Sequence, residues 1–113
     1  MPFIDSKITL ELTKEQKDTL KSRLGKAISI LSKPESYLMV GFEDNYDLYF
    51  AGKSLERGAY VSVSLFGDTK GPACENMTAE ICKIYEEVLA IPANNIYVTY
   101  HGVHDWGWNG QNF

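Results

Sequence analysis

A proline directly after the first methionine is the residue of this chain with the most unusual chemistry. The sequence opens MPFI, so removal of Met1 would leave Pro2 with a free secondary amine. The pKa of an ordinary α-amino group is about 8. Burial or a neighbouring cation lowers that pKa, because both disfavour the charged form. An amine that is neutral near pH 7 can take a proton from carbon and return it. Pro2 is therefore a candidate base if apolar residues surround it.

Two other sets of reactive residues offer weaker signals. His101, His104 and Asp105 are close in sequence, but no further ligands follow at the spacing that metal sites use. Cys74 and Cys82 are the only cysteines, and they form no CxxC pair. Two ordinary reduced thiols fit better than a disulfide or a redox pair. We therefore expect neither a metal site nor a redox pair in these residues.

The composition is that of one small acidic domain. The chain has 113 residues, which we interpret as a single domain over residues 1–113. Its net charge of -4 and pI near 5.1 argue against nucleic acid as a partner, because phosphates require a basic face. No apolar run is long enough for a membrane span, and MPFIDSKITLEL lacks the apolar region of a secretory signal. We expect a cytoplasmic protein without a membrane partner.

The elements that must position Pro2 come in two copies. PESYLMVGF begins at Pro34 and PANNIYVTY begins at Pro92, 58 residues apart, and each follows a segment with helical spacing. An extended segment precedes each helical one. The chain therefore predicts two β-α-β repeats, about 2–55 and 58–113, with parallel strands in each because a helix connects them.

Apolar spacing sets the boundaries of the expected elements. Alternation predicts strands, and apolar residues three or four positions apart predict helices. Thr13 and Gln16 can form a capping box at the start of the first helix, while Asn76 or Thr78 could cap the second. We expect strands over 3–12, 36–42, 59–66 and 95–102, an edge strand over 47–52, helices over 13–31 and 77–90, and a turn over 67–76. The apolar stripes of the two helices are Leu20, Leu24, Ala27, Ile28 and Leu31, and Ile81, Ile84, Tyr85 and Leu89.

These elements predict an α+β fold. A four-stranded mixed sheet with both helices on one face gives a two-layer sandwich and is the simplest packing. The other face of the sheet is then uncovered, and its strand residues are partly apolar. We therefore expect other subunits to cover that face, with the edge strand available for pairing across a subunit boundary.

Five segments together resemble the macrophage migration inhibitory factor (MIF) family of the tautomerase superfamily. They are MPF, SKPESYLMVGFED, YFAG, NNIYVTY and WGWNGQNF, and they cover nearly the whole chain in the order the family has. The resemblance implies a tautomerase/MIF-like homotrimer with active sites at the subunit boundaries. It also implies cofactor-free keto–enol tautomerase activity on small aromatic keto acids such as phenylpyruvate, and isomerisation of dopachrome-type substrates.

The same resemblance assigns roles to residues of this chain. Pro2 takes the place of the catalytic proline, and Lys33 that of the lysine that binds the substrate carboxylate. Phe66 stands where the family usually has isoleucine, whose backbone N–H contacts the ligand. Tyr97 matches a tyrosine donated by the neighbouring subunit, and Thr99 replaces an asparagine of mammalian members. The remaining substrate-binding residues are expected to be Tyr37, Trp106, Trp108 and Phe113.

Alternative interpretations remain open at this point. Lys33 alone could be a solvated lysine at a helix C-terminus, and Tyr97 could simply pack at an interface. Members of the family can leave cells without a signal peptide and bind receptors. The protein could therefore be secreted and act as a cytokine mimic, with a receptor protein as its partner. Dehalogenation or decarboxylation is a weaker alternative, because Arg23 and Arg57 are the only arginines and neither can be placed near Pro2.

Overall fold

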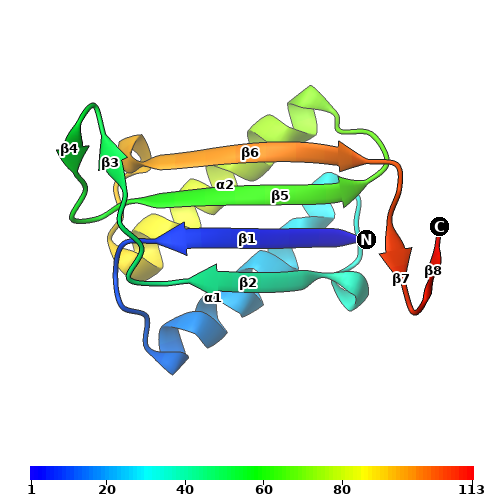
Figure 1. The fold of residues 1–113 in the computed structure, drawn as a ribbon, viewed down its shortest axis with the longest axis horizontal. Coiled ribbons are helices and arrows are strands. Elements are labelled where there is room, and N and C mark those ends of the chain that lie inside the picture. The colour runs from blue at the N-terminus through cyan, green and yellow to red at the C-terminus, as the bar shows by residue number, and fades with distance from the viewer.

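Four strands form one mixed sheet, and two helices cover one of its faces (Figure 1). The computed structural model describes residues 1–113. The spatial order is β2-β1-β5-β6; β1 runs parallel to β2 and antiparallel to β5, and β5 runs parallel to β6. This is the expected α+β two-layer sandwich. The bounds are Pro2–Ile8 for β1, Met39–Glu43 for β2, Ala59–Phe66 for β5, Ile96–Val103 for β6, Lys14–Ala27 for α1 and Gly71–Leu89 for α2.

The two β-α-β units repeat in detail. Short 3-10 helices, η2 over Glu35–Tyr37 and η3 over Ala93–Asn95, lie 58 residues apart. Ser32 and Ala90, also 58 residues apart, both adopt the left-handed conformation, with φ of 58° and 55°. Each ends its helical segment two residues before a proline, which cannot continue a helix. The repeat read from the two proline segments therefore extends to the backbone conformation.

The first helical segment follows the prediction closely. Thr13 accepts from the Gln16 backbone N–H, and the Gln16 side chain accepts from the Thr13 N–H, so the capping box is confirmed. The α-helix ends at Ala27 and continues as the 3-10 helix η1 over Ile28–Leu31. The five residues of the predicted apolar stripe are all buried.

The second helix begins earlier than predicted. It starts at Gly71, so the expected turn over 67–76 is wrong for its second half, and Asn76 and Thr78 lie inside the helix rather than at its cap. Pro72 explains the difference, because proline fits the first helical turn, where its missing N–H has no partner to lose. The predicted inner face of this helix is buried throughout.

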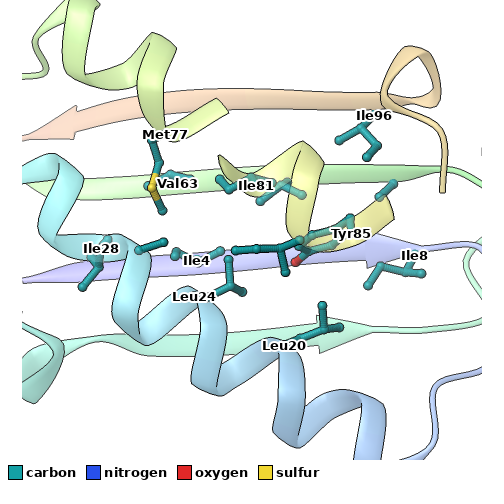
Figure 2. Close-up of a cluster of buried hydrophobic side chains, with 14 of the residues drawn as sticks. Ile4, Ile8, Leu20, Leu24, Ile28, Val63, Met77, Ile81, Tyr85 and Ile96 are labelled. Carbon is teal, nitrogen blue, oxygen red and sulfur yellow. The ribbon is translucent and has the colours of Figure 1, made fainter. Parts of the chain in front are cut away.

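The core lies between the sheet and the helices (Figure 2). Ile4, Ile8 and Val63 from the sheet meet Leu24 and Ile81 from the helices, all of them buried. Ser6 is the one buried polar residue, and its hydroxyl shares a hydrogen bond with the buried Tyr85 hydroxyl. Burial raises the pKa of Tyr85 well above its ordinary value. Buried and half-buried residues alternate strictly along β1 and β5, as expected for strands with one covered face.

The uncovered face of the sheet is apolar only at its ends. Phe3 and Met39 are neighbours in the register of β1 and β2 near the start of β1. In the middle, the Thr99 hydroxyl bonds both Tyr60 and His101.

The expected strand over 3–12 ends at Ile8, four residues early.

Two small hairpins extend the molecule at opposite ends of the sheet (Figure 1). At one end, β3 (Tyr49–Phe50) pairs with β4 (Lys53–Ser54), so the predicted edge strand is shorter than expected and is paired within the chain. At the other end, β7 (Gly107–Trp108) pairs with β8 (Gln111–Asn112) beside the N-terminus. No helix of the molecule has the length and apolar character that crossing a membrane requires.

Candidate active site

The largest cavity lies at the end of the sheet where β1 begins. Its volume is about 670 Å³, and its lining includes Met1, Pro2, Tyr37, Trp106 and Trp108. Most of the lining is apolar. Four of the residues predicted for the site therefore meet in one cavity. A cavity of this size and character can hold an aromatic ring and exclude water from it.

Pro2 is buried at the edge of this cavity. It is the first residue of β1 and lies opposite Leu65 of β5. With Met1 in place, the Pro2 nitrogen is part of a peptide bond, and the chain's free amine is that of Met1. Burial and then the positive charge of Lys33 lower the pKa of the Met1 amine from its ordinary value. The surroundings of the chain terminus therefore favour an uncharged amine.

An aromatic wall stands beside the cavity. The rings of Tyr37 and Trp108 meet edge to face with centroids 5.7 Å apart, and Trp108 stacks on Phe113 at 6.3 Å. Phe113 in turn lies 5.7 Å from Phe66. The Phe113 N–H donates to the Trp106 carbonyl at 3.1 Å, which ties the C-terminus to the start of the β7–β8 hairpin. Phe66 and Phe113 thus support the wall without lining the cavity themselves.

Lys33 lies near the chain terminus but outside the large cavity. Its ammonium group donates to the Phe66 carbonyl oxygen at 2.9 Å. Lys33 lines a second cavity of about 180 Å³, together with Asp68 and Lys70, rather than the large one. Its charge nevertheless acts on the Met1 amine. The Phe66 N–H donates to the Met1 carbonyl at 3.0 Å, so Phe66 contacts both groups through its backbone.

Tyr97 and Thr99 do not join this cavity within one chain. In the register of β5 and β6, Tyr97 lies opposite Tyr60, five positions along β6 from Gly102, which lies opposite Leu65. Tyr97 is 63% exposed, and its ring lies 5.6 Å from that of Phe50. Together with Tyr60 they line a small cavity at the far end of the sheet. These residues could reach a cavity like the first only in another copy of the chain.

Sequence reasoning missed several residues that line the large cavity. Phe3, Met39, Ser64 and Val103 all contribute to it from the uncovered face of the sheet. Alternation along each strand could have placed Phe3 and Ser64 on one face, but their pairing depends on the register between β1 and β5. That register follows from the tertiary packing, and no local signal carries it.

The two histidines and the two cysteines do not line the large cavity. His101 bonds Thr99 at 3.0 Å, while His104 pairs with Asp68 at 3.3 Å. No group of three or more His, Cys, Asp or Glu side chains is placed to hold a metal ion. Both cysteines are free thiols, and burial raises the pKa of Cys82.

Comparison with known proteins gives one consistent result. The sequence profile of the family described as "Macrophage migration inhibitory factor (MIF)" matches residues 1–113. The macrophage migration inhibitory factor of Xenopus laevis is 32% identical over 99 residues, 85% of each chain. The crystal structure of Leishmania major MIF2 matches with a TM-score of 0.94 and 32% identity, over 100% of this chain and 97% of that one. The macrophage migration inhibitory factor of Toxoplasma gondii matches with a TM-score of 0.91 and 26% identity, over 98% of this chain and 99% of that one.

Proposed function

The chain belongs to the macrophage migration inhibitory factor family, and we propose that it is a cofactor-free keto–enol tautomerase of small aromatic 2-keto acids. The proposal covers phenylpyruvate and dopachrome-type compounds as substrates. Pro2, freed by removal of Met1, is the general base and acid. The observation that carries the proposal is the position of Pro2, buried at the edge of an apolar cavity beside the charge of Lys33.

The reaction moves one proton and needs no oxidant or reductant. In ketonisation, the Pro2 amine takes the enol hydroxyl proton, and the carbonyl forms as the double bond shifts. The resulting ammonium then gives its proton to the adjacent carbon, so the amine is regenerated. One group can serve both steps only if its pKa lies near the working pH. The surroundings that lower the pKa of the Met1 amine support this role for the amine one residue further on.

The substrate carboxylate and ring are assigned to different parts of the site. Lys33 supplies a positive charge for the carboxylate, and a charge-assisted hydrogen bond of this kind contributes about 1.5–3 kcal/mol. The Phe66 backbone N–H is a second donor at the same place. Tyr37, Trp106 and Trp108 hold the aromatic ring. Exclusion of water by these residues strengthens the polar interactions.

A neighbouring subunit completes the site in this proposal. Most of the large exposed apolar residues of the chain gather at two different places, around the large cavity and around Tyr49, Phe50 and Tyr97 at the far end of the sheet. Contact between two unlike surfaces is head-to-tail, and such contacts form a ring when the rotation from one subunit to the next closes. A homotrimer of this kind would bring Tyr97 and Thr99 of one subunit to the Pro2 of the next. The Tyr97 hydroxyl could then donate to the carbonyl or enol oxygen.

The test is phenylpyruvate ketonisation followed by absorbance, with Pro2→Gly as the variant. Glycine keeps a terminal amine but loses the ring that holds the nitrogen in place. Because misplacement of a reacting group by about 1 Å can cost about 100-fold, we expect kcat/KM to fall by roughly that factor. Intact mass must show that Met1 is absent from both proteins, and sedimentation must show the same assembly. Pro92→Gly is the matched control, because Pro92 is exposed and lines neither cavity at the ends of the sheet. Unchanged activity in Pro2→Gly would reject the proposal.

A further inference from the structure

We propose that a cavity between the two helices binds a free α-amino acid with an apolar side chain. The cavity has a volume of about 410 Å³, and its lining residues are Arg23, Lys26, Ala27, Ile30 and Glu80. The first four come from α1 and η1, and Glu80 comes from α2, which lies beside α1 on the covered face of the sheet (Figure 1). None of these residues lines the large cavity, so the inference does not rest on the proposed function.

Lys26 and Glu80 bring opposite charges to this cavity, and neither charge has a partner within the chain. The ion pairs of the molecule join other residues. Lys26 and Glu80 form no ion pair with each other, so a gap separates the ammonium group on α1 from the carboxylate on α2. A ligand that carries two opposite charges of its own can occupy that gap and meet both groups.

Arg23 strengthens the positive side of the cavity. It lies three residues before Lys26, which places both cations on one face of α1. Its Nη2 donates to the Glu87 carboxylate at 2.8 Å, and this bond joins α1 to α2 and holds the guanidinium group. A guanidinium group has five N–H donors, so donors remain for a carboxylate that approaches Lys26. The α1 side of the cavity therefore favours the carboxylate of a ligand.

Two apolar residues complete the lining. Ala27 is buried and Ile30 is half-buried. A ligand with an apolar group can remove this surface from water, which favours binding. A ligand made only of charged groups would leave the surface wet. The lining therefore calls for a molecule with an apolar part beside its charges.

A zwitterion satisfies both sides of the cavity at once. A simple carboxylate would pair with Lys26 and bring its negative charge toward Glu80, and a simple amine would bring its positive charge toward Lys26. In an α-amino acid, the ammonium group, the carboxylate and the side chain leave the same carbon. The carboxylate then faces Lys26, the ammonium group faces Glu80, and an apolar side chain covers Ile30.

The experiment uses the full chain and L-leucine as the probe. Leucine has no ring, so the aromatic wall of the large cavity gives it no stacking partner. In protein with ¹³C-labelled alanine and isoleucine methyl groups, we expect the signals of Ala27 and Ile30 to shift and to saturate below about 20 mM L-leucine, since weak specific binding has a millimolar Kd.

Two analogues test the two charges in the unchanged protein. N-acetyl-L-leucine lacks the ammonium group, and L-leucinamide lacks the carboxylate. We expect each to bind about tenfold more weakly than L-leucine, the factor for loss of one hydrogen bond between charged groups. An affinity for either analogue equal to that for L-leucine would show that the cavity does not recognise a zwitterion, and would overturn the inference.

Two variants test the same charges from the side of the protein. We expect Lys26→Met and Glu80→Gln each to raise the Kd for L-leucine by about tenfold, with thermal unfolding as the check that both proteins fold. Lys21→Met and Glu75→Gln are the matched controls, because these exposed residues lie on the same helices outside the cavity, and their Kd should not change.

Three results would overturn the inference from these titrations. In the first, the Ala27 and Ile30 signals stay in place or fail to saturate up to about 20 mM L-leucine. In the second, Lys26→Met and Glu80→Gln bind L-leucine as well as the unchanged protein does. In the third, the control variants lose as much affinity as the cavity variants, which would mean that the general charge of the helices attracts the probe.

Discussion

In the proposed reaction a single amine is the chemical centre, and burial together with a neighbouring cation sets its charge state. Burial is the larger influence on the pKa of the terminal amine, and the positive charge of Lys33 is the smaller one. Only the neutral amine can act as a base. Activity should therefore rise as pH rises through the pKa of the Pro2 amine, at a midpoint below that of an exposed secondary amine.

Lys33→Met tests whether the positive charge of Lys33 lowers the pKa of the Pro2 amine. Removal of a nearby positive charge makes the ammonium form easier to reach, so the pKa of the Pro2 amine should rise. We expect the midpoint of kcat/KM against pH to move upward by roughly 0.5 of a pH unit, in addition to a loss of affinity for the carboxylate. Lys70→Met is the control, because Lys70 lines the same small cavity but does not act on the terminal amine. A downward shift, or equal shifts in both variants, would contradict the role given to Lys33.

The buried hydroxyl pair of Ser6 and Tyr85 makes a second prediction at this scale. Ser6→Ala leaves the Tyr85 hydroxyl without a partner in the core, at a cost of about 1–3 kcal/mol of unfolding free energy. The double variant Ser6→Ala with Tyr85→Phe removes both hydroxyls and should cost less than the two single changes added together. Urea unfolding at one fixed protein concentration measures all four proteins. Additive costs would show that the two hydroxyls are not coupled.

At the scale of elements, the left-handed residues that end the two helical segments make the clearest prediction. Ala90 has φ of 55°, which costs a residue with a Cβ about 1 kcal/mol or more. We expect Ala90→Gly to stabilise the protein by roughly 0.5–1 kcal/mol. Ala79→Gly is the same change at an exposed position inside α2, and it should destabilise by about 1 kcal/mol. Thermal unfolding of the two variants should therefore shift in opposite directions, and shifts of the same sign would contradict the helix end described here.

The elements also show which features the sequence can predict. The capping box of Thr13 and Gln16 and the apolar stripes were predictable, because each depends on residues within a few turns of one helix. The start of α2 was not, since Gly71 and Pro72 signal a turn in most contexts and fit a helix only in its first turn. The cavity depends on the register that brings Phe3 beside Ser64, and that register arises from packing across the sheet.

At the scale of the whole molecule, the sequence predicts which residues belong to the site better than it predicts where they lie. The family resemblance predicted Pro2, Tyr37, Trp106 and Trp108, and the structure brings these four together. The distance of Tyr97 from them could not be derived from composition or spacing. It becomes visible only when β6 is placed in the sheet, where Tyr97 lies near the start of the strand, at the end opposite Pro2.

Tyr49, Phe50 and Tyr97 are exposed aromatic residues at the end of the sheet opposite Pro2, and they predict how the molecule assembles. Phe50→Ser removes an apolar contact of the β3–β4 hairpin without touching the core, so each chain should still fold. We expect sedimentation to shift from trimer toward monomer at micromolar concentration, and tautomerase activity to fall with it, because isolated chains lack Tyr97 at the site. Tyr46→Ser is the control, since Tyr46 is also an exposed aromatic residue but lines neither end cavity. A Phe50→Ser protein that stays trimeric would place the subunit contact elsewhere.

The two β-α-β repeats make the two ends of the sheet structurally equivalent. Tyr60 pairs with Tyr97 as Phe3 pairs with Met39, so position 60 in the second half corresponds to position 3, position 95 to position 37, and position 97 to position 39. Tyr60, Asn95 and Tyr97 line the small far cavity, as Phe3, Tyr37 and Met39 line the large one. A chain has only one N-terminus, so the second repeat, where Ala59 stands in the place of Pro2, cannot present a terminal amine. The molecule thus contains a second, structurally equivalent cavity that has no terminal amine and that contacts another subunit in the proposed trimer.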